Sequence, residues 1–178
     1  AELADQAATG STPHRDYLAN LFELELDDRS ERRAQRRLLD ARFPHRKRLE
    51  DFQFEHSAVN AVELHQLAKG DYLARAENVI LIGESGTGKS HLATALGIVA
   101  CHQGRRVRFT TVAALVNELQ EAQDEHQLSR VVRRYAGIEL LILDLCRERN
   151  YAEKDPCARG GCLDVVEISP LDVVLTSA

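Results

Sequence analysis

Residues 78–93 read NVILIGESGTGKSHLA, an apolar run that leads into three closely spaced glycines and then into a second, helix-like segment. The apolar run Asn78–Ile82 predicts a buried strand, and the segment from Lys89 to about Gln103, which Gly104 follows, predicts a helix. Between them, residues 83–90 match the pattern G-x-x-x-x-G-K-[ST]. The sequence therefore predicts a strand, a glycine-rich turn and a helix in direct succession.

The glycine-rich turn predicts a phosphate-binding loop. Gly83, Gly86 and Gly88 lack a Cβ atom, so the loop can adopt positive φ and turn successive backbone N–H groups toward a phosphate. The helix that starts near Lys89 adds the partial positive charge of its N-terminus, Lys89 is placed to reach the β and γ oxygens, and Ser90 offers a hydroxyl to Mg²⁺. The predicted nucleotide-binding residues are Gly83, Glu84, Ser85, Gly86, Thr87, Gly88, Lys89, Ser90 and His91.

An aspartate at the end of another predicted strand supports the assignment of the phosphate-binding loop. The apolar run Leu140–Leu143 ends at Asp144, which places a carboxylate at the end of a predicted strand. Such a carboxylate beside a phosphate loop holds the hydration shell of Mg²⁺, an arrangement known as Walker B. Ser90 and Asp144 are therefore the predicted metal ligands.

The remaining pattern from residue 77 onward is α/β. We predict a strand at 106–110, a helix at 112–122 that begins after Thr110 or Thr111, and a helix at about 126–136. Strands that are apolar on both faces and alternate with helices predict a parallel sheet covered on both sides. The fold class is α/β, a P-loop NTPase sheet flanked by helices.

The N-terminal part is helical and basic. We predict a long helix at about 14–42, ended by Pro44, and a second helix capped by Ser57 that runs to Lys69, with Gly70 after it. Residues 48–54 are predicted to form an extended connector between the two helices. Residues 29–48 hold nine basic residues against two acidic ones. This block is interpreted either as a solvated helix face or as a surface that contacts DNA phosphates without sequence preference. The predicted DNA-contacting residues are Arg29, Arg32, Arg33, Arg36, Arg37, Arg46, Lys47 and Arg48.

Length and composition exclude other classes. The 178 residues correspond to one domain, and the formal net charge is −5. The longest apolar run is far shorter than the ~18 residues that cross a bilayer, and residues 1–20 hold no apolar signal segment. We therefore expect no membrane contact and a cytoplasmic location. The four cysteines show no CxxC spacing, so we expect free thiols rather than a zinc site.

Taken together, these motifs resemble the IstB-like helper ATPases of insertion-sequence transposition, which are relatives of the DnaC-type helicase loaders within the AAA+ class. The resemblance covers roughly residues 14–144 and includes the run GKSHLA, the segment CHQGRRVRF at 101–109, and LLILD at 140–144. The segments ARFP at 41–44 and LEDF at 49–52 are also similar. The resemblance implies binding of ATP and Mg²⁺, assembly on DNA, and partnership with a transposase, with a homo-oligomer as a further expectation.

The resemblance ends directly after Asp144. Similar ATPases place a glutamate there that activates the attacking water, whereas this chain has Leu145, so hydrolysis is uncertain. We expect residues 1–13 to be disordered, 14–70 to form the helical basic region, 71–144 the ATP-binding core, and 145–178 an atypical tail with one or two strands, one of them at 173–177. The domain is expected to be incomplete at the C-terminus. Alternatives to a transposition helper ATPase are a non-hydrolysing nucleotide- and DNA-binding protein, an adaptor similar to a helicase loader, and a small-molecule P-loop kinase.

Overall fold

The structure is a computed structural model that describes residues 13–54, 59–84, 86–145 and 163–170. The chain divides into two compact units, residues 1–36 and 37–178. The first unit holds most of helix α2 (His14–Asp40), and the second holds the sheet and the other helices. In the described part of the chain, no helix is both long enough and apolar enough to cross a membrane.

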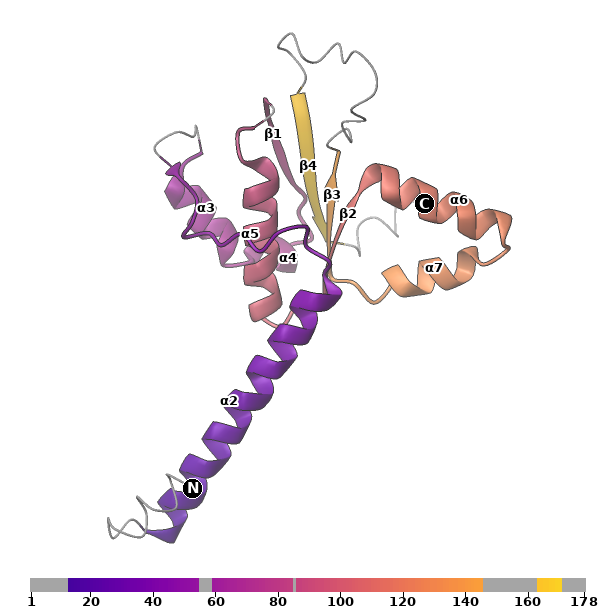
Figure 1. The fold of residues 1–178 in the computed structure, drawn as a ribbon. Coiled ribbons are helices and arrows are strands. Elements are labelled where there is room, and N and C mark those ends of the chain that lie inside the picture. Colours follow the sequence, from indigo (N-terminus) through magenta and orange to yellow (C-terminus); the bar gives the residue numbers. More distant parts are fainter. Residues whose placement is uncertain (1–12, 55–58, 85, 146–162, 171–178) are drawn as a thin grey trace. The chain divides into compact units, whose positions relative to one another are not determined.

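The second unit is built on a four-stranded sheet with the order β1-β4-β3-β2 (Figure 1). The strands are β1 (Val79–Glu84), β2 (Val107–Thr111), β3 (Leu140–Asp144) and β4 (Leu163–Pro170). Strands β2 and β3 are parallel, and β4 runs antiparallel to both β1 and β3. The three strands predicted between residues 78 and 144 therefore share one direction, as expected, and their carboxyl ends lie at the same edge of the sheet.

Strand β4 departs from the predicted all-parallel sheet. Its first residue, Leu163, pairs with Glu84 at the carboxyl end of β1, and β3 also ends at that edge. The chain thus leaves the sheet and re-enters it at the same edge, so β4 has to run in the opposite direction. The strand predicted at 173–177 lies outside the described residues.

Helices cover the two faces of the sheet unequally. Helix α5 (Lys89–His102) packs on one face with α3 (Ala61–Ala68) and α4 (Asp71–Ala74) beside it, whereas α6 (Val112–Asp124) and α7 (Leu128–Tyr135) lie on the other (Figure 1). The larger core lies under α5 and the smaller one under α6 and α7. The larger core includes Leu92, Leu96, Leu140, Ile142, Val166 and Ile168.

The predicted cover on both faces is wrong at β1. Val79 and Leu81 are half-buried toward the α5 side, but the alternate residues Ile80 and Ile82 are 55% and 64% exposed. The described helices α6 and α7 pack over Leu141 of β3 instead. A run of apolar residues predicts burial of both faces, but only a neighbouring element can provide it.

Local capping chemistry sets several helix boundaries. Helix α3 is capped by Asn60, whose side chain accepts a hydrogen bond from the Val62 N–H at 2.9 Å, so the predicted cap at Ser57 is wrong. Gly70, with φ +84°, follows this helix as predicted. Thr111 caps α6 by accepting from the Ala114 N–H at 3.1 Å, which settles the choice between Thr110 and Thr111.

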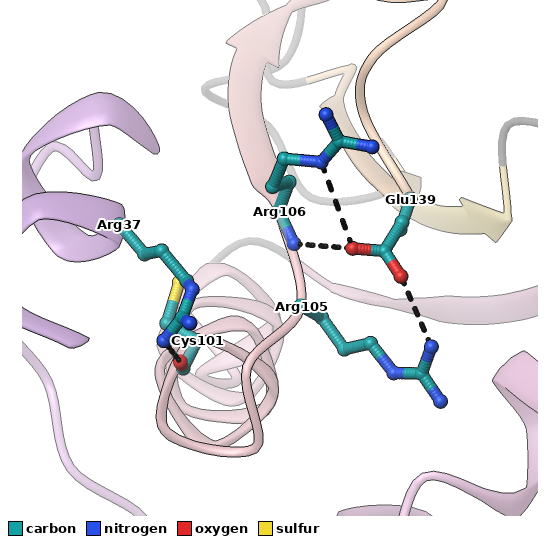
Figure 2. A network of polar contacts seen from close by, with 5 residues as sticks. All are labelled: Arg37, Cys101, Arg105, Arg106 and Glu139. Atoms are coloured by element: carbon teal, nitrogen blue, oxygen red, sulfur yellow. Dashed lines mark hydrogen bonds and ion pairs between the residues drawn. The ribbon is translucent and has the colours of Figure 1, made fainter. Parts of the chain in front are cut away.

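Two polar contacts fix the amino-terminal edge of the sheet (Figure 2). The Glu139 carboxylate, directly before β3, accepts from the backbone N–H of Arg106 and from the Arg105 guanidinium, both at 3.0 Å. Burial acts to raise the pKa of Glu139, but the hydrogen bonds and charges of Arg106 and Arg105 outweigh it and lower the pKa. Nearby, Arg37 donates to the Cys101 carbonyl in the last turn of α5 at 3.3 Å.

Burial of Tyr72 makes the fold sensitive to alkali. Tyr72 is only 3% exposed, and this burial raises its pKa to about 12. A folded-state pKa above the unfolded value of 10.0 means that the stabilising contribution is complete below pH 10 and is lost as the pH rises toward 12. We predict that Tyr72→Phe removes about 2 kcal/mol of the stability loss between these pH values. Urea unfolding of the parent and of Tyr72→Phe at pH 8 to 11.5 measures the unfolding free energy as a function of pH. Identical pH profiles of the two proteins would contradict the burial of the phenol.

Candidate nucleotide-binding site

The phosphate loop connects the end of β1 to the start of α5. Gly86 and Gly88 have φ values of +86° and +87°, which confirms that these two positions require glycine conformations. Gly83 lies within β1, where an added Cβ atom would be 3.2 Å from Thr87 Oγ1, so its small size serves close packing. Ser85 lies outside the described residues. The helix begins at Lys89 with Gly88 as its N-cap and no side-chain cap, so its first N–H groups face the loop.

The side chain of Lys89 lies within the loop. Its ammonium group donates to the Glu84 carbonyl oxygen at 2.6 Å and to Thr87 Oγ1 at 3.3 Å, and the residue is 8% exposed. The Thr87 hydroxyl also donates to the Glu84 carbonyl at 2.9 Å. These bonds hold the cation at the centre of the loop, within reach of an anion that the loop would bind.

The two predicted metal ligands meet. Ser90 Oγ, in the first turn of α5, donates to Asp144 Oδ2 at 2.8 Å, although 54 positions separate the two residues. Asp144 is the last residue of β3 and is 6% exposed. A hydroxyl and a carboxylate are the hard oxygen donors that Mg²⁺ prefers, so this pair fits that ion. The parallel direction of β1 and β3 produces the meeting, because both strands end at the same edge.

A cavity of about 410 Å³ opens beside the loop. The phosphate loop forms one wall, and residues 46–53, which come from a different part of the chain, form the other. This volume is typical of small-ligand sites. The lining residues are Arg46, Lys47, Asp51, Phe52, Gln53, Gly86, Thr87, Gly88 and His91.

The wall formed by residues 46–53 was missed as part of the site. Residues 48–54 are predicted from the sequence as an extended connector, although Phe52 and Phe54 in this polar stretch indicate packing. The ring of Phe52 meets the ring of His91 edge to face, with centroids 5.4 Å apart. His91 Nε2 also donates to the Arg48 carbonyl oxygen at 2.9 Å. The first turn of α5 therefore holds this wall in place.

The eight arginines and lysines predicted to contact DNA do not share one helix. Arg29 and Arg32 lie on α2 and pair with Glu25 and Asp28, one turn earlier, at 2.7 Å and 3.1 Å. Arg33 and Arg36 are exposed on the same helix.

The other four belong to the second unit, where their positions differ. Arg37 donates to the end of α5, as described above. Arg46 and Lys47 line the cavity, whereas the guanidinium of Arg48 lies 4.0 Å from Glu50. Because α2 ends at Asp40, the segment that carries residues 46–48 is separate from the helix. The charge block in the sequence is therefore divided between different structural settings.

The residue after Asp144 offers no proton acceptor. Leu145 is 46% exposed, and its side chain is a hydrocarbon. A phosphoryl-transfer site needs a group that orients the attacking water. This position does not supply one.

A phosphate loop between a strand and a helix, with Lys-Ser at the helix start and an aspartate at the end of a neighbouring parallel strand, defines a P-loop nucleotide-binding protein. Within that class, the chain belongs to the IstB-like ATP binding protein family, whose model matches residues 1–167. The predicted family and fold class are thereby confirmed.

Three relatives illustrate this similarity. A Sinorhizobium fredii protein named as an insertion-sequence ATP-binding protein is 38% identical over 156 residues, which cover 86% of this chain and 51% of that protein. An ATP-binding protein of Pseudomonas aeruginosa named for insertion sequence IS21 is 36% identical over 143 residues, which cover 80% of this chain and 54% of that protein. An ATP-binding protein of Geobacillus stearothermophilus named for insertion sequence IS5376 is 30% identical over 155 residues, which cover 86% of this chain and 61% of that protein. The chain thus spans about half to three fifths of the length of these relatives.

Two loop glycines provide a matched test of the geometry. A Cβ atom at Gly88 would lie 2.7 Å from Phe52 Cε2, whereas one at Gly86 would meet nothing within 4 Å. Both positions have positive φ, so each alanine costs about 1 kcal/mol of backbone strain. We predict that Gly88→Ala destabilises the protein by a further ~1–3 kcal/mol, because the added methyl displaces the Phe52 ring.

Urea unfolding of the two variants measures this difference in unfolding free energy. In a Phe52→Ala background, the difference should shrink to a few tenths of a kcal/mol, since the obstructing ring is gone. Equal destabilisation by the two alanines in the parent background would show that Phe52 does not rest on Gly88.

Proposed function

We propose that this chain binds ATP together with Mg²⁺ through the loop at residues 83–90, and that it does so as the nucleotide-binding part of a transposition helper protein. The observation that carries the proposal is the contact between Ser90 and Asp144 at 2.8 Å, at the helix start that also carries Lys89, whose ammonium group lies within the loop. A glycine-rich turn does not by itself place a hydroxyl, a carboxylate and an ammonium group at one edge of a sheet. P-loop NTPases use these three groups to hold the phosphates and Mg²⁺.

In the proposed complex, the phosphates lie against the backbone N–H groups of the loop and the first turn of α5. The partial positive charge of that helix end favours an anion. The ammonium group of Lys89 exchanges its bond to the Glu84 carbonyl for bonds to phosphate oxygens. Because the lysine is already positioned, little side-chain entropy is lost on binding.

Ser90 and Asp144 would hold Mg²⁺, the hydroxyl directly and the carboxylate directly or through its hydration shell. When bound, the ion neutralises phosphate charge. The protein's part is to keep both oxygen ligands at one edge of the sheet, and the hydrogen bond between them already aligns Ser90 with the carboxylate.

The proposal predicts a large loss of affinity in Lys89→Ala. Removing a charge-assisted hydrogen bond to phosphate weakens binding of Mg²⁺·ATP by roughly 100-fold or more. Isothermal titration calorimetry with the parent and the variant measures this. Lys89→Met, which keeps the apolar stem, should lose affinity to a similar extent while it preserves the packing.

Lys69→Ala is the matched control. Lys69 is exposed, and it caps α3 through its backbone N–H rather than its side chain, so its replacement should leave the affinity unchanged. Equal affinity of the parent and Lys89→Ala for Mg²⁺·ATP would refute the assignment of the loop.

We extend the proposal to DNA and a transposase as partners. The support is that the relatives are named for insertion sequences, which are DNA elements, and that α2 carries exposed Arg33 and Arg36 near the paired Arg29 and Arg32. Phosphate contacts of this kind are independent of DNA sequence and weaken with salt. In this proposal, α2 within the basic region 14–70 serves DNA or partner contact, 71–144 form the ATP-binding core, and 145–178 supply β4. An adaptor similar to a helicase loader is the alternative that uses the same residues.

Hydrolysis by this chain is proposed to be absent or very slow, because Leu145 stands where similar ATPases place a glutamate. We predict no more than residual ATPase turnover by the parent, with or without duplex DNA, and a measurable gain in Leu145→Glu. Steady-state phosphate release measures both, and Leu145→Gln is the matched control that adds a polar group without a base. Brisk multiple turnover by the unmodified chain would refute this part of the proposal.

A further inference from the structure

Arg46 and Lys47 follow the arginines of α2 closely in the sequence but do not belong to that helix. Helix α2 ends at Asp40, and Pro44 lies between that end and Arg46. Both residues line the cavity whose other wall is Gly86–Gly88 and His91. Two basic residues thus lie across the cavity from the phosphate loop.

The segment that carries them is attached to the loop at several points. The Arg48 carbonyl oxygen accepts from His91 at 2.9 Å, and the Phe52 ring meets His91 edge to face and fills the space that a Cβ atom at Gly88 would need. The segment also bonds to itself, since the Arg48 N–H donates to Asp51 Oδ2 at 3.2 Å and the Phe52 N–H to the Leu49 carbonyl at 3.2 Å. These bonds form a turn, which corrects the view of 48–54 as an extended connector. Arg46 and Lys47 are therefore presented to the cavity by an anchored turn.

The charge of the cavity wall suits a polyphosphate. Arg46 and Lys47 contribute two positive charges, and among the described lining residues Asp51 is the one carboxylate. Lys89 adds a third cation at the base of the loop. Clustered cations repel one another unless an anion accompanies them, and the loop already offers an anion site.

We propose that Arg46 and Lys47 contact the phosphate tail of the bound nucleotide, and that they belong to the ATP site rather than to a DNA-contacting surface. This inference rests on the proposed function of the loop and adds to it a second, cationic wall. The wall comes from the segment before the α/β core. Phe52 and His91 act as positioning residues, because they hold the turn without needing to touch the nucleotide.

The test compares four alanine variants, one of them a control, by titration calorimetry with Mg²⁺·ATP. Arg46→Ala and Lys47→Ala should each weaken binding about 5-fold, and the double variant roughly 30-fold, as expected for exposed charge-assisted contacts. Arg48→Ala is the matched control, since its side chain is exposed beside Glu50 and only its backbone contributes to the turn. It should bind within about 2-fold of the parent.

Two further readouts separate a phosphate contact from a structural effect. The decrease in affinity with rising salt should be shallower in the double variant than in the parent, because fewer cations contact the anion. Arg46→Lys with Lys47→Arg should retain most of the affinity, since the charges remain. The thermal midpoint should be unchanged, because both side chains are exposed.

The outcomes are distinct. A parent chain that does not bind Mg²⁺·ATP refutes the proposed function, and this inference with it. A parent that binds while the double variant binds equally well, with the same salt slope, refutes the inference alone. It is also refuted if the double variant keeps its nucleotide affinity but loses retention of duplex DNA, since Arg46 and Lys47 would then be DNA contacts.

Discussion

The close approach of α5 to the sheet at Gly97 is the constraint on which the site depends. A Cβ atom at this glycine would lie 2.7 Å from Ile142 Cδ1 and 2.8 Å from Phe43 Cε1, so only glycine permits the observed contact. The helix carries Lys89 and Ser90 at its first turn, and β3 carries Ile142 two residues before Asp144. Packing at Gly97 therefore sets the distance between the hydroxyl and the carboxylate, and a rigid interior transmits any shift to them.

The same helix connects the segment before the α/β core to that core. Phe43 meets Gly97 in the middle of α5, and Phe52 meets Gly88 at its start. The Phe109 N–H donates to the Ala41 carbonyl at 2.8 Å, which ties the beginning of this segment to β2. Residues 41–54 are thus packed on the core along the length of α5. This makes the second wall of the cavity as well positioned as the loop itself, and preorganised groups bind a ligand at lower entropic cost.

The sequence predicts the parts of the site that local chemistry determines. The glycines at 86 and 88, the start of α5 and the end of β3 follow from spacing and periodicity within a few residues, so Ser90 and Asp144 could be assigned to one site. Contacts between distant segments could not be predicted in this way. The direction of β4 and the cavity position of Arg46 depend on which segments pack together, and one-dimensional patterns carry little information about that.

Charge in the sequence is similarly incomplete as a guide to charge on the surface. The helix arginines follow an acidic stretch at a spacing of one turn, so Glu25 meets Arg29 and Asp28 meets Arg32. The hydrogen bond from Arg29 lowers the pKa of Glu25, which keeps the carboxylate charged and the pair neutral overall. Exposed pairs of this kind are weak, so DNA phosphates can compete for the arginines. In the proposed complex with DNA, the helix would have to give up two carboxylate partners as it gains phosphate partners, so its net attraction for DNA would be smaller than the count of arginines suggests.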